Sequence, residues 1–192
     1  MSAPVFFYDF SSPYSYLAAA RVDDVLSVQP EWQPISFGFI VRHLGKTPWS
    51  FAADRQADFR EIERRASERG LPPVRYPDGW PIETYSLTPL RAAALAAEAG
   101  LVRELSRELF AVAFVNGRSL ADMDAVLDAA DRAGMDRAEL RRGLQRQDVK
   151  DRVRAATEAA IARGVSGVPT VAVGETLFWG DDRLEEAAAA TA

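Results

Sequence analysis

The chain has 192 residues, of which 48% are hydrophobic and 27% charged, as expected of a globular protein of one domain, with or without an insertion. Its formal net charge of −5 gives no bulk attraction to nucleic acid or anionic membranes, and no apolar run approaches the ~18 residues of a membrane span. Cysteine is absent and His43 is the only histidine, which excludes disulfides, thiolate zinc sites, a protein-borne thiol nucleophile and a cluster of histidine ligands. We therefore expect no metal, nucleic-acid or membrane partner.

The N-terminal part of the chain predicts a β-α-β unit. Pro4–Phe10 is short, apolar and rich in aromatic residues, as a buried strand is. A helix is expected from Pro13 to about Val28, and Trp32–Ile40 indicates a second strand. The opening MSAPVFFYDF has neither a basic segment nor a small-residue cleavage site, so we expect no signal peptide and a cytoplasmic protein.

The middle of the chain has a helical pattern. Ser50–Arg69 is charged and helical, whereas Leu71–Glu83 is rich in proline and predicts a loop. Glycines stand at or near the ends of the segments that follow, as C-terminal stop signals do. Helices are expected over Thr88–Ala99, Leu101–Val115, Ser119–Ala133, Asp136–Gln145 and Asp148–Arg163.

Strands return near the C-terminus. Thr170–Val173 and Thr176–Trp179 flank Gly174-Glu175, a two-residue hairpin signal. A last helix is expected to begin near Asp181-Asp182.

The order of these elements is β-α-β, a set of helices, then β-β-α. This order predicts an α/β protein with a thioredoxin-like fold, residues 1–44 and 161–192, interrupted by an all-helical insertion, residues 45–160, that forms a separate lobe. We expect the first strand to pair parallel with the second and antiparallel with the strand after Pro169.

Ser12-Pro13-Tyr14-Ser15 joins the first strand to the first helix. A strand that ends in Cys-Pro-x-Cys at a helix start is the site of thiol–disulfide oxidoreductases, but here serine stands at both cysteine positions. One interpretation is capping, since Ser is a preferred N-cap and Pro a preferred first helical residue. The other is that the Ser12 hydroxyl donates a hydrogen bond to a thiolate that a ligand brings in. Ser12 is poorly placed as a nucleophile, because no His or Lys is adjacent in sequence.

Two C-terminal stretches are further candidates. The stretch GVSGVPTVAVG contains Pro169 directly before a predicted strand. One interpretation is that this proline only marks the start of the strand. The other is that the Val168–Pro169 bond is cis and that the backbone beside it pairs with an extended, peptide-like ligand. In FWGDDRLEE, helix capping explains one of Asp181 and Asp182, which leaves the other carboxylate free to receive an ammonium group.

Lys46 and several aromatic residues are weaker candidates. Lys46 follows the second strand and either faces the start of the first helix or is a solvated surface group. Trp49, Trp80 and Tyr85 either line an aromatic wall or belong to the core.

Two stretches carry a resemblance to a known family. FYDFSSPYSYLA looks like a strand–Ser-Pro-x-Ser–helix opening, and EAAIARGVSGVPTVAVGETLFWGDDRLEE looks like the closing segment of the same family. Over essentially its whole length, the chain resembles the kappa-class glutathione transferases and 2-hydroxychromene-2-carboxylate isomerases, a branch of the DsbA-like thioredoxin superfamily.

The resemblance implies roles for particular residues. Ser12 matches the serine that contacts the glutathione sulfur and keeps it as thiolate, and Pro13 and Tyr14 continue that loop. Val168 matches the residue whose backbone pairs with the cysteinyl unit of glutathione, next to a cis proline at Pro169.

The remaining implied contacts include two departures from the family. Asp181 and Asp182 fall where the family holds the γ-glutamyl end, but the family usually shows Ser-Asp or Gln-Asp there. Lys46 stands about where the family has an Asn before Lys-Pro-Pro, and it is our candidate for a further glutathione contact.

The resemblance therefore implies a glutathione-dependent isomerase or kappa-type transferase that acts on a small aromatic or conjugated electrophile. It also implies a homodimer and a part in the catabolism of aromatic compounds. Another low-molecular-weight thiol is an alternative to glutathione. The alternative function is a redox-inactive thioredoxin-like module that binds a partner without catalysis.

Overall fold

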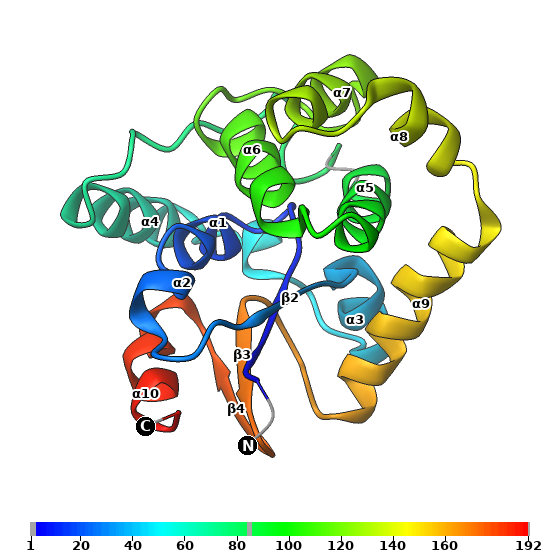
Figure 1. The fold of residues 1–192 in the computed structure, drawn as a ribbon. Helices are drawn as coiled ribbons and strands as arrows, with labels where there is room; N and C mark the ends of the chain where they lie inside the picture. The colour runs from blue at the N-terminus through cyan, green and yellow to red at the C-terminus, as the bar shows by residue number, and fades with distance from the viewer. Residues whose placement is uncertain (1–2, 84–85, 192) are drawn as a thin grey trace.

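The computed structural model describes residues 3–83 and 86–191. Its centre is a four-stranded sheet with helices on both faces (Figure 1). The strands follow the order β2-β1-β3-β4 across the sheet. Their bounds are β1 Val5–Tyr8, β2 Glu31–Pro34, β3 Thr170–Val173 and β4 Thr176–Trp179.

The pairing of the strands confirms the predicted thioredoxin fold. β1 runs parallel to β2, with Val5 opposite Glu31, and antiparallel to β3, with Val5 opposite Ala172. β3 and β4 form the predicted antiparallel hairpin.

The helices and 3-10 turns connect and cover these strands, and in residues 90–160, all of which the structure describes, there is no strand. Among the described helices, none is both long and apolar enough to cross a membrane. The bounds are α1 Pro13–Ala19, α2 Val22–Val25, α3 Phe37–Leu44, η1 Trp49–Phe51, α4 Gln56–Glu68, α5 Leu87–Glu98, α6 Val102–Phe114, α7 Met123–Arg132, α8 Arg137–Gly143, α9 Gln147–Ala162, η2 Asp181–Arg183 and α10 Leu184–Ala189.

The second strand was predicted to run to Ile40, and this is wrong. β2 ends at Pro34, and α3 begins two residues beyond Ile35. Ser36 caps this helix, because its Oγ accepts a hydrogen bond from the N–H of Phe39 at 3.3 Å. The apolar residues of the segment recur at helical spacing, which outweighs their aromatic and β-branched composition.

The first helix is also shorter than predicted. It ends at Ala19, and Arg21, with φ −130° and ψ −22°, separates it from α2. Arg21 forms an ion pair with Glu185 on α10. The interruption between α1 and α2 therefore places the Arg21 guanidinium against the C-terminal helix. Farther along, the predicted helix from Ser50 begins as the short turn η1 and continues as α4 only from Gln56.

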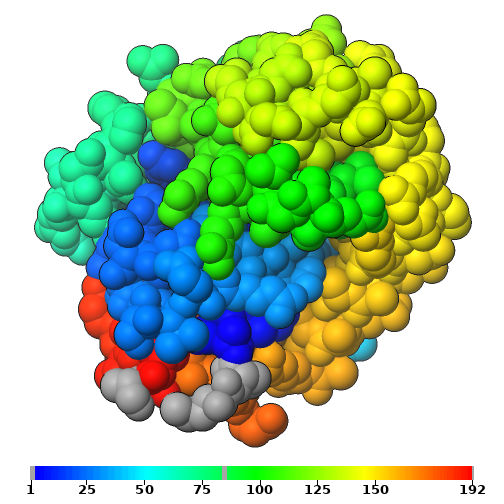
Figure 2. Space-filling model, viewed as in Figure 1, coloured from blue at the N-terminus to red at the C-terminus, as the bar shows by residue number. Residues whose placement is uncertain are grey.

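The helical segment shares one hydrophobic core with the sheet instead of forming a separate lobe. Tyr8 of β1 bonds Ser106 of α6 through their hydroxyl oxygens at 2.7 Å, and the rings of Phe10 and Phe110 lie 4.9 Å apart. On the other face of the sheet, Phe7 packs into a second cluster with residues of α3 and α9. Figure 2 shows the green part of the helical segment packed directly onto the blue N-terminal part. The boundaries of the insertion at 44/45 and 160/161 stay a prediction.

Candidate active site

Ser12 lies where β1 meets α1, and it caps that helix. Its Oγ accepts a hydrogen bond from the N–H of Ser15 at 3.2 Å, and Pro13 is the first helical residue, so the capping interpretation is correct. Ser12 also lines a cleft of about 430 Å³. Because the cap uses Oγ as an acceptor, the hydroxyl hydrogen is left to donate to a ligand in that cleft.

The turn before Ser12 is held from both sides. The carboxylate of Asp9 accepts the N–H of Ser11 at 2.8 Å, and the carbonyl of Asp9 accepts the N–H of Ser12 at 3.1 Å. The indole N–H of Trp80 donates to the carbonyl of Ser11 at 3.1 Å. These bonds fix the position of Ser12 from β1 on one side and from the helical segment on the other.

Asp9 is a residue that sequence reasoning missed. It is fully buried, and burial raises the pKa of its carboxyl, an effect that the hydrogen bonds it accepts oppose. Besides Ser11, its carboxylate accepts the N–H of Phe37 at 2.7 Å and the hydroxyl of Ser86 at 3.2 Å. All three donors line the cleft. The signal in the sequence is an acidic residue inside an otherwise apolar strand segment.

The walls of the cleft are apolar and aromatic. Its lining includes Phe37 and Val41 of α3 together with Trp49, Phe51 and Trp80. The rings of Trp49 and Trp80 lie 5.8 Å apart, so the predicted aromatic wall is present. Its third predicted member, the tyrosine at position 85, lies outside the described residues.

The structure does not bring Lys46 to this wall. Lys46 follows Gly45, the C-terminal cap of α3, and it is exposed. It is not among the described residues that line the cleft, whereas Arg42, one turn earlier on α3, is.

A second groove of about 270 Å³ adjoins the cleft and shares Phe37 and Trp49 with it. Tyr14, Val168 and Asp182 line this groove. The peptide bond between Val168 and Pro169 is cis, as predicted. Residues from the two ends of the chain thus meet in one continuous depression around the start of α1.

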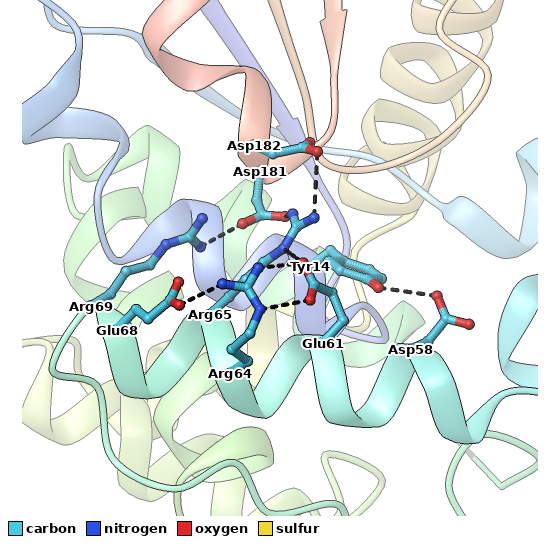
Figure 3. A network of polar contacts seen from close by, with 9 residues as sticks. All are labelled: Tyr14, Asp58, Glu61, Arg64, Arg65, Glu68, Arg69, Asp181 and Asp182. Atoms are coloured by element: carbon cyan, nitrogen blue, oxygen red, sulfur yellow. Dashed lines mark hydrogen bonds and ion pairs between the residues drawn. The ribbon is translucent and has the colours of Figure 1, made fainter.

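Asp181 and Asp182 have different surroundings, and neither acts as a helix cap. Asp181 is 1% exposed, and its two carboxylate oxygens lie 2.6 Å from Arg65 and 2.5 Å from Arg69 on α4 (Figure 3). A carboxylate held in this way is not free to receive an ammonium group. The side chain of Asp182 is 58% exposed, and its one ion pair among the described residues is a 3.4 Å contact with Arg65, so it is the more accessible carboxylate of the two.

Arg65 links this acidic pair to Tyr14. Its guanidinium carbon lies 5.7 Å from the centre of the Tyr14 ring, and Tyr14 donates its hydroxyl hydrogen to Asp58 at 3.1 Å (Figure 3). Burial, followed by the Asp58 charge, raises the pKa of the Tyr14 hydroxyl, so Tyr14 stays neutral. The network fixes the side chain of Tyr14 along the groove.

Comparisons with known proteins agree with this architecture. The sequence profile of the DSBA-like thioredoxin domain matches residues 5–192, and the chain belongs to that family. 2-Hydroxychromene-2-carboxylate isomerase of Sphingobium xenophagum is 23% identical to it, over 94% of this chain and 93% of that protein. Glutathione S-transferase kappa 1 of Homo sapiens is 28% identical, over 93% of this chain and 86% of that protein. The resemblance predicted from the sequence is thereby confirmed.

Solved structures show the same fold. The structure of a 2-hydroxychromene-2-carboxylate isomerase matches with a TM-score of 0.85 at 22% identity, covering 98% of this chain and 94% of that one. The cytosolic disulfide reductase DsbM from Pseudomonas aeruginosa, solved with GSH, matches with a TM-score of 0.65 at 20% identity, covering 99% and 96%.

Proposed function

We propose that the protein is a glutathione-dependent isomerase or kappa-type glutathione transferase for a small aromatic or conjugated electrophile. One observation carries the proposal: a serine with a spare hydroxyl hydrogen lines an aromatic cleft that continues into a groove ending at an exposed carboxylate. The relatives named above include enzymes of both kinds.

The residues present fit glutathione. We assign its ammonium group to Asp182, its cysteinyl backbone to Val168, and its sulfur to the hydroxyl of Ser12. Pro13 and Tyr14 border the path between them. Bound glutathione supplies the nucleophilic sulfur, which adds to the electrophile and then either leaves after bond rotation or stays attached.

Ser12 supplies the stabilisation of the thiolate. A thiol is mostly neutral at neutral pH, and the thiolate is the nucleophile. A hydrogen bond to a charged acceptor contributes about 1.5–3 kcal/mol. That energy lowers the pKa of the bound thiol by roughly one to two units, at about 1.36 kcal/mol per unit.

The alternative is a binding module without catalysis, and a plain binding module has no need for a free carboxylate at the end of the groove. Several finer predictions from the resemblance belong to this proposal: the homodimer, the part in aromatic catabolism, the cytoplasmic location, and glutathione instead of another small thiol.

Two measurements test the proposal. Glutathione at about 100 times its Kd raises the free energy of unfolding by about 2.7 kcal/mol, which appears as a rise in Tm. Titration of the thiolate absorbance of bound glutathione gives a higher pKa in Ser12→Ala than in the wild type. Ser15→Ala is the matched control, because Ser15 lies on the same helix and its Oγ has no hydrogen-bond partner within the described part of the chain. Coincident titrations of Ser12→Ala and wild type, or no Tm shift, would favour the binding module.

A further inference from the structure

Gly38 is a helical glycine for which the fold itself gives no reason. It is the second residue of α3, in ordinary helical conformation, and a Cβ built on it meets no heavy atom within 4 Å among the described residues. Glycine weakens a helix relative to alanine, because it loses more conformational freedom on folding. Gly45 at the end of the same helix differs, since its φ of +62° is one that other residues rarely adopt.

The position of Gly38 is fixed relative to Ser12. The carboxylate of Asp9 accepts the N–H of Ser11 with one oxygen and the N–H of Phe37 with the other, at 2.8 and 2.7 Å. One buried group therefore ties the start of α3 to the Ser11–Ser12 turn. Gly38 and Ser12 line the same cleft.

The lining of the cleft combines a residue without a side chain with aromatic rings. Gly38 of α3 contributes only backbone to this lining, while Trp49 and Trp80 contribute rings whose centres lie 5.8 Å apart. A planar ring system gains contact area from aromatic rings, and it lies close to a backbone where no side chain intervenes.

We propose that Gly38 is a specificity-determining residue, whose missing side chain keeps open the space in which a planar, conjugated electrophile lies next to the glutathione sulfur. The inference rests on the proposed function and adds the residue that selects the shape of the electrophile. A side chain at position 38 is expected to fill that space, and Gly38 is not among the described residues that line the groove of Tyr14, Val168 and Asp182.

The experiment compares Gly38→Ala and Gly38→Leu with the wild type, using two electrophiles of different shape. In 1-chloro-2,4-dinitrobenzene the thiolate forms a C–S bond as the C–Cl bond breaks and chloride leaves; in iodomethane it displaces iodide from a single carbon. We expect Gly38→Leu to lower kcat/KM for the flat arene by about tenfold or more, while the reaction with iodomethane changes little.

Two further readouts exclude a general loss of structure. Glutathione gives the same Tm shift in Gly38→Leu as in the wild type, whereas affinity for S-(2,4-dinitrophenyl)glutathione falls by about tenfold. Gly38→Ala raises the Tm of the unliganded protein, because alanine favours the helix, and still weakens binding of that conjugate. Gly45→Ala is the control: it lowers the Tm and leaves the ratio of the two substrates unchanged.

The outcomes separate the two proposals. If wild type binds glutathione and turns over both electrophiles, but Gly38→Leu keeps the wild-type ratio between them, the role of Gly38 is overturned and the proposed function stands. If wild type shows no Tm shift with glutathione, both are overturned.

Discussion

Arg65 on α4 donates a hydrogen bond to Asp181 in η2 across 2.6 Å, which joins the helical segment to the C-terminal end of the sheet domain. Arg69, one turn later on the same helix, holds the other carboxylate oxygen. Asp181 was a candidate ligand-binding residue from the sequence, and this pairing makes it a structural anchor instead. The exposed Asp182 beside it is the carboxylate to which the proposed function assigns the ammonium group of glutathione.

Asp181→Asn tests the anchor. The change leaves two arginines against a neutral amide in a buried place, and losing one partner of a buried ion pair lowers the free energy of unfolding by about 3 kcal/mol or more. Urea unfolding measures the loss. Asp182→Asn is the neighbouring control and changes stability by less than about 0.5 kcal/mol, because its side chain is exposed. Equal free energies of unfolding for the two variants would contradict the role of Asp181 as a structural anchor.

Asp182→Asn tests the ammonium receptor. Removing a charged hydrogen bond worth about 1.5–3 kcal/mol raises the Kd for glutathione by about tenfold to a hundredfold. Isothermal titration calorimetry measures this change. Ser12→Ala provides the comparison, because it is expected to alter the pKa of the bound thiol more than the affinity. An unchanged Kd in Asp182→Asn would exclude this residue as the receptor.

Glu61 gives a prediction about acid stability. Hydrogen bonds from Arg64 and Arg65 lower the pKa of its carboxyl to about 2, below its ordinary value of 4.5. Because the folded-state value is the lower one, the stabilisation is present above pH 4.5 and is lost as the pH falls toward 2. The pair lies near the surface, so its contribution is below about 1 kcal/mol.

The measurement is urea unfolding of Glu61→Gln and wild type at about pH 5 and about pH 3. The variant loses less stability than the wild type between these two conditions. Glu63→Gln on the same helix is the control, because Glu63 forms no ion pair within the described residues. An equal loss in Glu61→Gln and wild type would show that the arginines do not hold this carboxylate in solution.

The buried bond between Tyr8 and Ser106 gives a prediction about the shared core. Tyr8→Phe leaves the Ser106 hydroxyl without its partner, and Ser106→Ala leaves the Tyr8 hydroxyl, so each lowers the free energy of unfolding by about 1–3 kcal/mol. The double variant loses less than the sum of the two, because no polar group is then left unpaired. Chemical unfolding of all four proteins gives the coupling energy. If the losses of stability in the two single variants simply add in the double variant, the hydrogen bond between Tyr8 and Ser106 does not stabilise the contact between sheet and helix.

Local signals made much of the fold predictable. The start of α1 follows from Ser12 and Pro13, and the hairpin from Gly174-Glu175, because capping and turn preferences depend on neighbours in sequence. The prediction of a strand after Pro34 was wrong because the composition of that segment does not decide between strand and helix. Phe37 and Ile40 suit a buried strand or a buried helix face equally, and the cap at Ser36 decided between them.

The sequence drew attention to several residues of the candidate site but not to the long-range pairs that they form. The sequence pointed to Ser12 and to the Asp181-Asp182 pair, and the structure places both around one depression. The sequence did not show that Asp181 pairs with two arginines that lie more than a hundred positions earlier in the chain. The part played by Asp9 was likewise hidden, because its donors come from three separate segments.

The position of β1 between β2 and β3 also affects how the protein is made. β1 and β2 leave the ribosome well before Ala172, which pairs with Val5. At about 5–20 residues per second, the nascent chain waits roughly ten seconds or more before the centre of the sheet closes. The helices α5 and α6 are made in that interval and pack on the same side as Phe6 and Tyr8. They are therefore positioned to cover the apolar face of the unfinished sheet until its last strands arrive.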